Sequence, residues 1–168
     1  MTILGTLQAD DGTGIVRMED RVDTAIEDVW AALTDPDRLA HWLGEVRGDL
    51  RLGGEFSAHF LASGWEGTGR VEACEPPRQL LVLTRDADEP DGAFEHAIEV
   101  TLSADGDGTE IAWEERGMPV ELLSAYGAGI QVHVEDLASY LAGGERCDAA
   151  ARFGELHPAY QDLAATVS

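Results

Sequence analysis

The chain has no lysine and no asparagine, and these absences exclude several catalytic chemistries. Without lysine there can be no Schiff-base nucleophile and no phosphate-binding loop that ends in lysine. Without asparagine, a Cys-His-Asn arrangement is excluded as well. The motifs G-x-S-x-G, H-E-x-x-H and G-x-G-x-x-G are also missing from the sequence. The sequence therefore contains no motif that assigns an enzymatic reaction.

Cysteine and long apolar runs are scarce too. The cysteines are Cys74 and Cys147, and no C-x-x-C spacing occurs. This pattern predicts unpaired thiols in a reducing compartment rather than a disulfide framework. No apolar run is long enough to span a bilayer, and the apolar start at residues 1–4 is too short for a signal peptide. We therefore expect a cytoplasmic protein with no membrane segment.

Positive charge is the third scarcity. The 11 basic residues are all arginines, against 33 Asp and Glu, so the net charge is −22. Such a chain would be repelled by a phosphate backbone or an anionic membrane, which argues against nucleic-acid and membrane partners. A basic protein partner stays open. Part of the acidity is interpreted as a solvated face of the expected strands, formed by Glu95, Glu99, Glu110 and Glu114.

The histidines do not predict a metal site. Five are present, but no two share the spacing of metal ligands on one element. His133 and Glu135 fall on different faces of the helix expected there. We therefore expect no metal and no other cofactor.

The sequence does contain a series of short alternating strands, from about residue 46 to 116, followed by one long apolar helix at about 120–141. Residues 15–22 predict a first strand ahead of them, and two short helices come after it. This order predicts an α+β fold, in which a curved antiparallel sheet of about seven strands surrounds a long C-terminal helix and leaves a hollow between them.

The two short helices have recognisable start signals. Thr24 and Glu27 have the spacing of a capping box, with a hydroxyl at the N-cap and a carboxylate three residues later. Asp35 then predicts a second N-cap, with Pro36 at the first helical position.

The long helix contains Gly127 and Gly129, each of which weakens a helix by about 1 kcal/mol relative to alanine. They would leave room for a ligand or allow close packing against a neighbouring element, and both explanations stay open. Glycines at 143 and 144 end the helix, so residues 1–144 are expected to form the domain. Residues 145–168 predict a helical tail on or near that domain, interrupted at Pro158.

Several local sequences, taken in order from about residue 15 to 144, resemble one known family. They are VWAALTDP (29–36), LAHWL (39–43), DLRLGGEF (49–56), GTGRV (67–71), EPPRQL (75–80), GTE (108–110), ERGMP (115–119) and residues 129–143. The set is similar to the heat-shock-protein-90 ATPase activator-homologue family of the START-like (SRPBCC, helix-grip) superfamily. The resemblance implies a helix-grip fold with a cavity between sheet and long helix. Ile130 stands where many relatives have tryptophan, which would enlarge or reshape that cavity.

Residues expected to point into the cavity combine aromatic rings with a few polar groups, as small-molecule pockets do. They are Trp65, His96, Trp113, Glu115, Tyr126, Ile130 and His133. His96 lies on an otherwise apolar strand face, where an unpaired imidazole would be costly to bury. The alternative interpretation is that the aromatic residues are ordinary core and the histidine is hydrogen-bonded there or faces solvent.

Three functions follow as hypotheses, because the superfamily includes ligand binders, cyclases and co-chaperone domains. The first is a non-enzymatic module that binds a small apolar or aromatic molecule in the cavity. The second is a cyclase, dehydratase or hydrolase that uses His96 or His133 as general acid or base. The third is a co-chaperone or regulatory domain with a chaperone or other protein partner. A homodimer is a further hypothesis for the partner.

Overall fold

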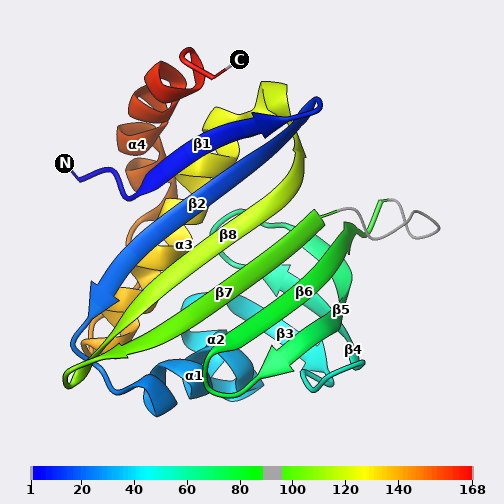
Figure 1. Cartoon of the computed structure of the whole chain (residues 1–168), viewed down its shortest axis with the longest axis vertical. Helices are drawn as coiled ribbons and strands as arrows, with labels where there is room; N and C mark the ends of the chain where they lie inside the picture. The colour runs from blue at the N-terminus through cyan, green and yellow to red at the C-terminus, as the bar shows by residue number, and fades with distance from the viewer. Residues whose placement is uncertain (1, 89–95, 168) are drawn as a thin grey trace.

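A single antiparallel sheet of eight strands curves around a long helix (Figure 1). This computed structural model describes residues 2–88 and 96–167. The strands are β1 (Gly5–Asp10), β2 (Thr13–Val22), β3 (Gly44–Gly48), β4 (Glu55–Phe60), β5 (Glu66–Glu75), β6 (Gln79–Asp86), β7 (His96–Asp105) and β8 (Gly108–Pro119). Their order across the sheet is β1-β2-β8-β7-β6-β5-β4-β3. The α+β helix-grip prediction is confirmed.

The sheet has one strand more than the approximate seven expected. The additional strand, β1, pairs with β2 through a hairpin at Asp11 and Gly12, both of which have positive φ angles. An Asp-Gly pair between alternating segments is a strong hairpin signal, so the sequence did contain the evidence for β1. The series of strands expected from about residue 46 starts with β3, which ends at Gly48, and Leu52 beyond it is 66% exposed.

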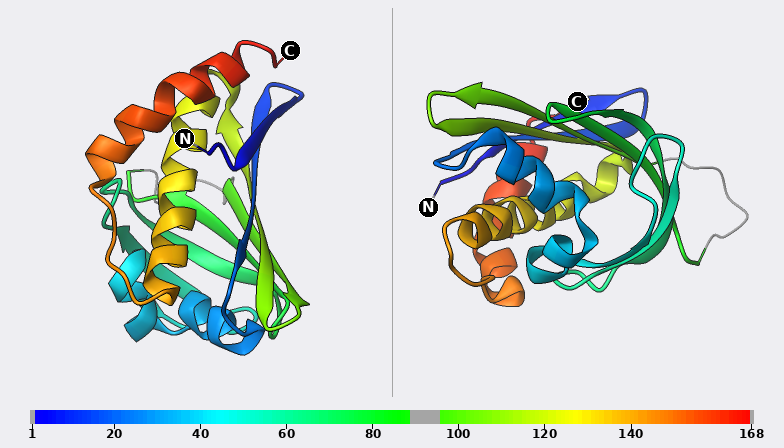
Figure 2. Two further views of the ribbon diagram at one scale, coloured as in Figure 1. Left: turned by 90° about the vertical axis from the view of Figure 1, so that its left-hand side faces the viewer. Right: turned by 90° about the horizontal axis from the view of Figure 1, so that it is seen from below.

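Four α-helices lie on the concave side of the sheet (Figure 2). They are α1 (Ile26–Thr34), α2 (Pro36–Trp42), α3 (Leu123–Leu141) and α4 (Ala149–Ala164), with a short 3₁₀ turn at Val120–Leu122 before α3. Asp35 caps α2 as predicted, accepting a hydrogen bond from the backbone N–H of Asp37 at 3.0 Å. The prediction of a capping box at Thr24 was wrong, because α1 starts one residue later and Ala25 is its N-cap. The Thr24 carbonyl instead accepts a hydrogen bond from the Thr109 hydroxyl.

The tail folds into one helix, α4, which continues through Pro158 where an interruption was expected. Its packing on α3 explains why the proline does not end it. Leu156 and Tyr160 flank the proline and are both fully buried. One turn earlier, Arg152 forms a bidentate pair with Glu135 of α3, with two N–O distances of 2.8 Å. These contacts hold the helix on both sides of Pro158.

The core lies between the concave face of the sheet and α3. It is built largely from alternate residues of β2, β7 and β8 together with α3: Val16, Met18, Val100, Leu102, Ile111, Trp113, Leu123, Val134 and Leu137. Because one face of each central strand is buried here, the strand register is fixed. Opposite the middle of α3, however, the sheet and the helix do not touch everywhere, and the site described below lies there.

Several remaining sequence predictions concern single residues or absences. Cys74 and Cys147 are free thiols. Among residues 2–88 and 96–167, no group of three His, Cys, Asp or Glu is arranged to hold a metal ion. No helix of the described part is both long and apolar enough to cross a membrane. Glu95, which was assigned to the acidic face, lies outside the described residues.

Candidate functional site

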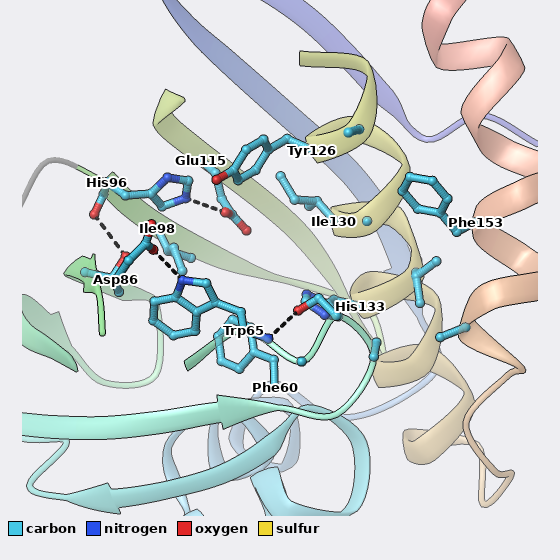
Figure 3. A pocket seen from close by; sticks show the side chains of 18 of the residues that line it. Phe60, Trp65, Asp86, His96, Ile98, Glu115, Tyr126, Ile130, His133 and Phe153 are labelled. Atoms are coloured by element: carbon cyan, nitrogen blue, oxygen red, sulfur yellow. Dashed lines mark hydrogen bonds and ion pairs between the residues drawn. The ribbon is translucent and has the colours of Figure 1, made fainter. Parts of the chain in front are cut away.

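A cavity of about 680 Å³ lies between the sheet and α3 (Figure 3). Its lining comes from β6, β7 and β8 on one side, α3 on the other, and the β4–β5 loop and the start of α4 at the margins. The lining residues are Phe60, Ala62, Ser63, Gly64, Trp65, Thr84, Asp86, His96, Ile98, Glu115, Ala125, Tyr126, Gly129, Ile130, Val132, His133, Ala149, Ala150 and Phe153.

A hydrogen-bonded pair, His96 and Glu115, forms a polar corner of this cavity. The His96 Nε2 atom lies 2.6 Å from Glu115 Oε1. The second carboxylate oxygen accepts a hydrogen bond of 2.9 Å from the Trp113 indole N–H. Glu115 is only 6% exposed, so these bonds satisfy a carboxylate that would otherwise be costly to bury.

Neighbouring strands bring the pair together. Glu115 on β8 stands opposite Ile98 on β7, and His96 is two residues before Ile98 on the same face. Side chains two residues apart on a strand point the same way, so both His96 and Glu115 reach the cavity. On the helix side, the Tyr126 ring stacks on the imidazole of His96, with centroids 5.5 Å apart.

Aromatic rings form the opposite end of the cavity. The Phe60 ring lies 4.8 Å from Trp65 and meets His133 edge-on at 5.3 Å. The Trp65 indole N–H donates a hydrogen bond of 2.6 Å to Asp86 Oδ1, which fixes the ring against the end of β6. Gly67 on β5 has no side chain that would collide with this ring.

Two ionisable side chains in the lining are shifted by burial. Desolvation lowers the pKa of His133 below its ordinary value of 6.5, so its imidazole is neutral at pH 7. Desolvation also raises the pKa of Tyr126, and the nearby carboxylates Asp86 and Glu115 raise it further. Within residues 2–88 and 96–167, no hydrogen bond holds the His133 ring, so its nitrogen atoms are available to a ligand.

The two glycines of α3 have different surroundings, and each fits one of the explanations left open by the sequence. A Cβ atom at Gly127 would lie 2.6 Å from the Tyr160 ring, so this glycine permits close packing of α4. A Cβ atom at Gly129 would meet nothing within 4 Å. Gly129 borders the cavity and leaves it open.

Six of the seven residues predicted for the site line the cavity: Trp65, His96, Glu115, Tyr126, Ile130 and His133. The seventh, Trp113, is placed elsewhere. It is 4% exposed, packs edge-on against Trp42 at 6.2 Å, and supports the cavity only through its bond to Glu115. Trp113 and Glu115 share one face of β8, but Glu115 borders the cavity whereas Trp113 lies in the packed core.

Sequence reasoning missed the contribution of the tail. Ala149, Ala150 and Phe153 from the first turns of α4 border the cavity. It also missed Phe60 and Asp86. For Phe60 a signal existed, since it alternates with Ala58 on an inward strand face. For the α4 residues there was none, because their position depends on the long-range contact between Tyr160 and Gly127.

One known protein family matches most of the chain. The profile of the family described as "Activator of Hsp90 ATPase homolog 1-like protein" matches residues 23–142. The chain belongs to this family. The resemblance drawn from the sequence is thereby confirmed, while α4 and its cavity residues fall outside the matched range. A search of curated proteins finds no match.

Solved structures of similar proteins share the fold over most of the chain. CalU16 from Micromonospora echinospora is 26% identical, with a TM-score of 0.76 and 96% of each chain covered. DynU16, described as a protein in the dynemicin biosynthetic locus, is also 26% identical, with a TM-score of 0.69, over 83% of this chain and 51% of its own. An Hsp90 activator from Plasmodium falciparum is 17% identical, with a TM-score of 0.64 over 76% of this chain and 96% of its own.

Proposed function

We propose that this protein binds a small, largely apolar or aromatic molecule in the cavity between the sheet and α3. The observation that carries the proposal is an open space of about 680 Å³, within the roughly 300–1,000 Å³ typical of small-molecule sites. Rings of Phe60, Trp65, Tyr126 and Phe153 line it, and the His96–Glu115 pair adds a polar corner.

The geometry suggests how such a ligand would be held. Burial of its apolar surface would supply most of the binding free energy, at about 25 cal/mol per Å² before the costs of association. The unbonded imidazole of His133 would accept or donate one hydrogen bond and so orient the ligand. The likeness to DynU16 supports a role with small molecules, since that protein is described as one from the dynemicin biosynthetic locus.

Two measurements test the proposal. Native mass spectrometry of the purified protein, followed by denaturing extraction, looks for a retained small molecule. Titration with the neutral fluorophore N-phenyl-1-naphthylamine then measures the cavity directly. We expect Ile130→Trp to fill the cavity and to lower the affinity for the fluorophore by at least about tenfold, or 1.4 kcal/mol. Leu52→Trp, at a residue that is 66% exposed, is the matched control and should leave affinity unchanged. Equal affinity in both variants would contradict the proposal.

Acid–base catalysis is a second candidate, favoured by the 2.6 Å contact between His96 and Glu115 at the cavity lining. A carboxylate that orients a histidine is the arrangement of a general base and its supporting group. In the test, a ligand that binds the protein is incubated with the wild type and, separately, with His96→Gln. The molecules recovered from the two incubations are then compared by mass. A mass change that depends on His96 would support catalysis, and the same molecule from both would exclude it.

A chaperone partner and a homodimer remain predictions. Likeness to the Plasmodium falciparum activator and to an Aha1 dimer from Colwellia psychrerythraea, at 17% and 15% identity, extends to the fold. A pull-down at low salt tests the partner, because an attraction driven by the net charge of −22 would be strongest there.

A further inference from the structure

We infer that the cavity selects a cationic ligand, an apolar or aromatic body that carries a protonated amine, and disfavours carboxylates, sulfonates and phosphates. This inference rests on the proposed function and specifies the chemical class of the ligand. It follows from the charges and ring faces of the lining.

The formal charge of the lining is of one sign. Among the described residues that line it, the acidic ones are Asp86 and Glu115, and none is an arginine. His133 adds no positive charge at pH 7 because burial lowers its pKa. An anionic ligand would therefore enter a partly desolvated space without a cationic partner there, which is costly.

The charge on His96 does not reverse this conclusion. A protonated His96 would cancel the charge of Glu115, to which it is bonded at 2.6 Å. Asp86 would still leave the lining negative. The hydrogen bond that Asp86 accepts comes from the neutral indole of Trp65, at 2.6 Å. Burial is the main reason that the pKa of Tyr126 is raised, and the charges of Asp86 and Glu115 raise it further.

The rings suit a cation as well. Trp65 and Tyr126 border the same cavity, and Asp86 lies beside Trp65 (Figure 3). Ring faces attract ammonium groups, most strongly those of tryptophan. An amine near Asp86 would combine this attraction with a charge-assisted hydrogen bond. Glu115 would act mainly through its field, because both of its oxygens already accept hydrogen bonds.

Three matched probes test the inference: 2-naphthylmethylamine, 2-naphthylmethanol and 2-naphthoate, which share a ring system and differ in charge. Each is titrated against N-phenyl-1-naphthylamine in the wild type at 0.15 M salt, where the outer surface charge is screened beyond about 8 Å. We expect the amine to compete at least about tenfold better than the alcohol, and the carboxylate about tenfold worse.

Two variants assign the preference to the cavity. The quantity compared is the ratio of the affinity for the amine to the affinity for the alcohol. Asp86→Asn should lower this ratio most of the way to one, and Glu115→Gln should lower it by less. Glu110→Gln, on the outer face of β8, removes the same charge outside the cavity and should leave the ratio unchanged. If Glu110→Gln lowers the ratio as much as Asp86→Asn, the preference comes from the surface and the inference is wrong.

The outcomes also separate this inference from the proposed function. Equal competition by all three probes, or preference for the carboxylate, overturns the inference while the cavity remains a binding site. Failure of every probe, with no difference between Ile130→Trp and Leu52→Trp, overturns both.

Discussion

The two sides of α3 contrast sharply in how they are packed. One side presents Gly127, Gln131 and Glu135 to β1 and α4, and the contact there is close and polar. The other presents Gly129, Ile130 and His133 to the cavity. The same helix thus fastens the tail on one side and leaves a hollow on the other.

The packed side is held by a buried network centred on Gln131. Its side-chain oxygen accepts from the backbone N–H of Leu4 at 3.1 Å and from the Tyr160 hydroxyl at 2.5 Å. Its amide donates to the Thr2 carbonyl and to Glu135. Tyr160 in turn accepts from the backbone N–H of Gly5. This network fastens α3 to α4 and to the start of the chain, on the side of α3 away from the cavity.

The largest effect is expected on the packed side, from Tyr160→Ala. The side chain is fully buried, and its loss would leave a void and unpaired groups on Gln131 and Gly5. We expect a loss of about 3–5 kcal/mol in the free energy of unfolding, measured by urea denaturation. Phe153→Ala, a half-buried ring at the cavity, should cost under about 1 kcal/mol. A similar cost for both variants would contradict the contrast between the two sides.

Gly127→Ala is expected to have the next largest effect. The new Cβ atom would lie 2.6 Å from the Tyr160 ring, so α4 must shift. Overpacking of this kind costs about 1–3 kcal/mol, partly offset by the better helix propensity of alanine. The measurement is again urea denaturation. A more stable variant would mean that α4 is not packed as described.

Gly129→Ala should have the opposite sign. A Cβ atom there meets nothing within 4 Å, so only the gain in helix propensity remains, up to about 1 kcal/mol. Thermal unfolding of the two alanine variants, two residues apart on one helix, gives the comparison. A melting temperature below that of the wild type for Gly129→Ala would show that the space is occupied.

The smallest effect is confined to a pH window and concerns His133. Its pKa is lowered in the fold by burial, so the unfolded chain binds more protons below about pH 6.5. Stability should fall as the pH drops through 6.5 towards the lowered folded pKa and level off beneath it. His133→Met should be less sensitive over that window than the wild type. Identical pH profiles of unfolding would contradict the burial of a neutral imidazole.

The fold was predictable from the sequence because its signals are local. Strand alternation, the Asp35-Pro36 helix start and the helix stop after residue 142 all survive in the structure. Errors arose where tertiary contacts decide. Thr24 does not cap α1, and its carbonyl accepts a hydrogen bond from the Thr109 hydroxyl. Buried contacts of α4 on both sides of Pro158 keep that helix continuous.

The site was predictable only in part. Period two placed Glu115 and Trp113 on one strand face, and the structure puts the first at the cavity and the second in the core. Periodicity identifies the inward face, but it does not say where along that face the opposing element stops touching it. The contribution of Phe153 was hidden for a related reason, since α4 reaches the cavity only because Gly127 admits Tyr160.

Gly129→Leu tests the central claim most directly, because one variant reports on both packing and binding. Its unfolding free energy and its affinity for N-phenyl-1-naphthylamine are measured on the same sample. The side chain would extend from the open position of Gly129 into the cavity. We predict a protein at least as stable as the wild type that binds the fluorophore at least about tenfold more weakly. Lower stability, or unchanged affinity, would contradict an empty ligand site beside α3.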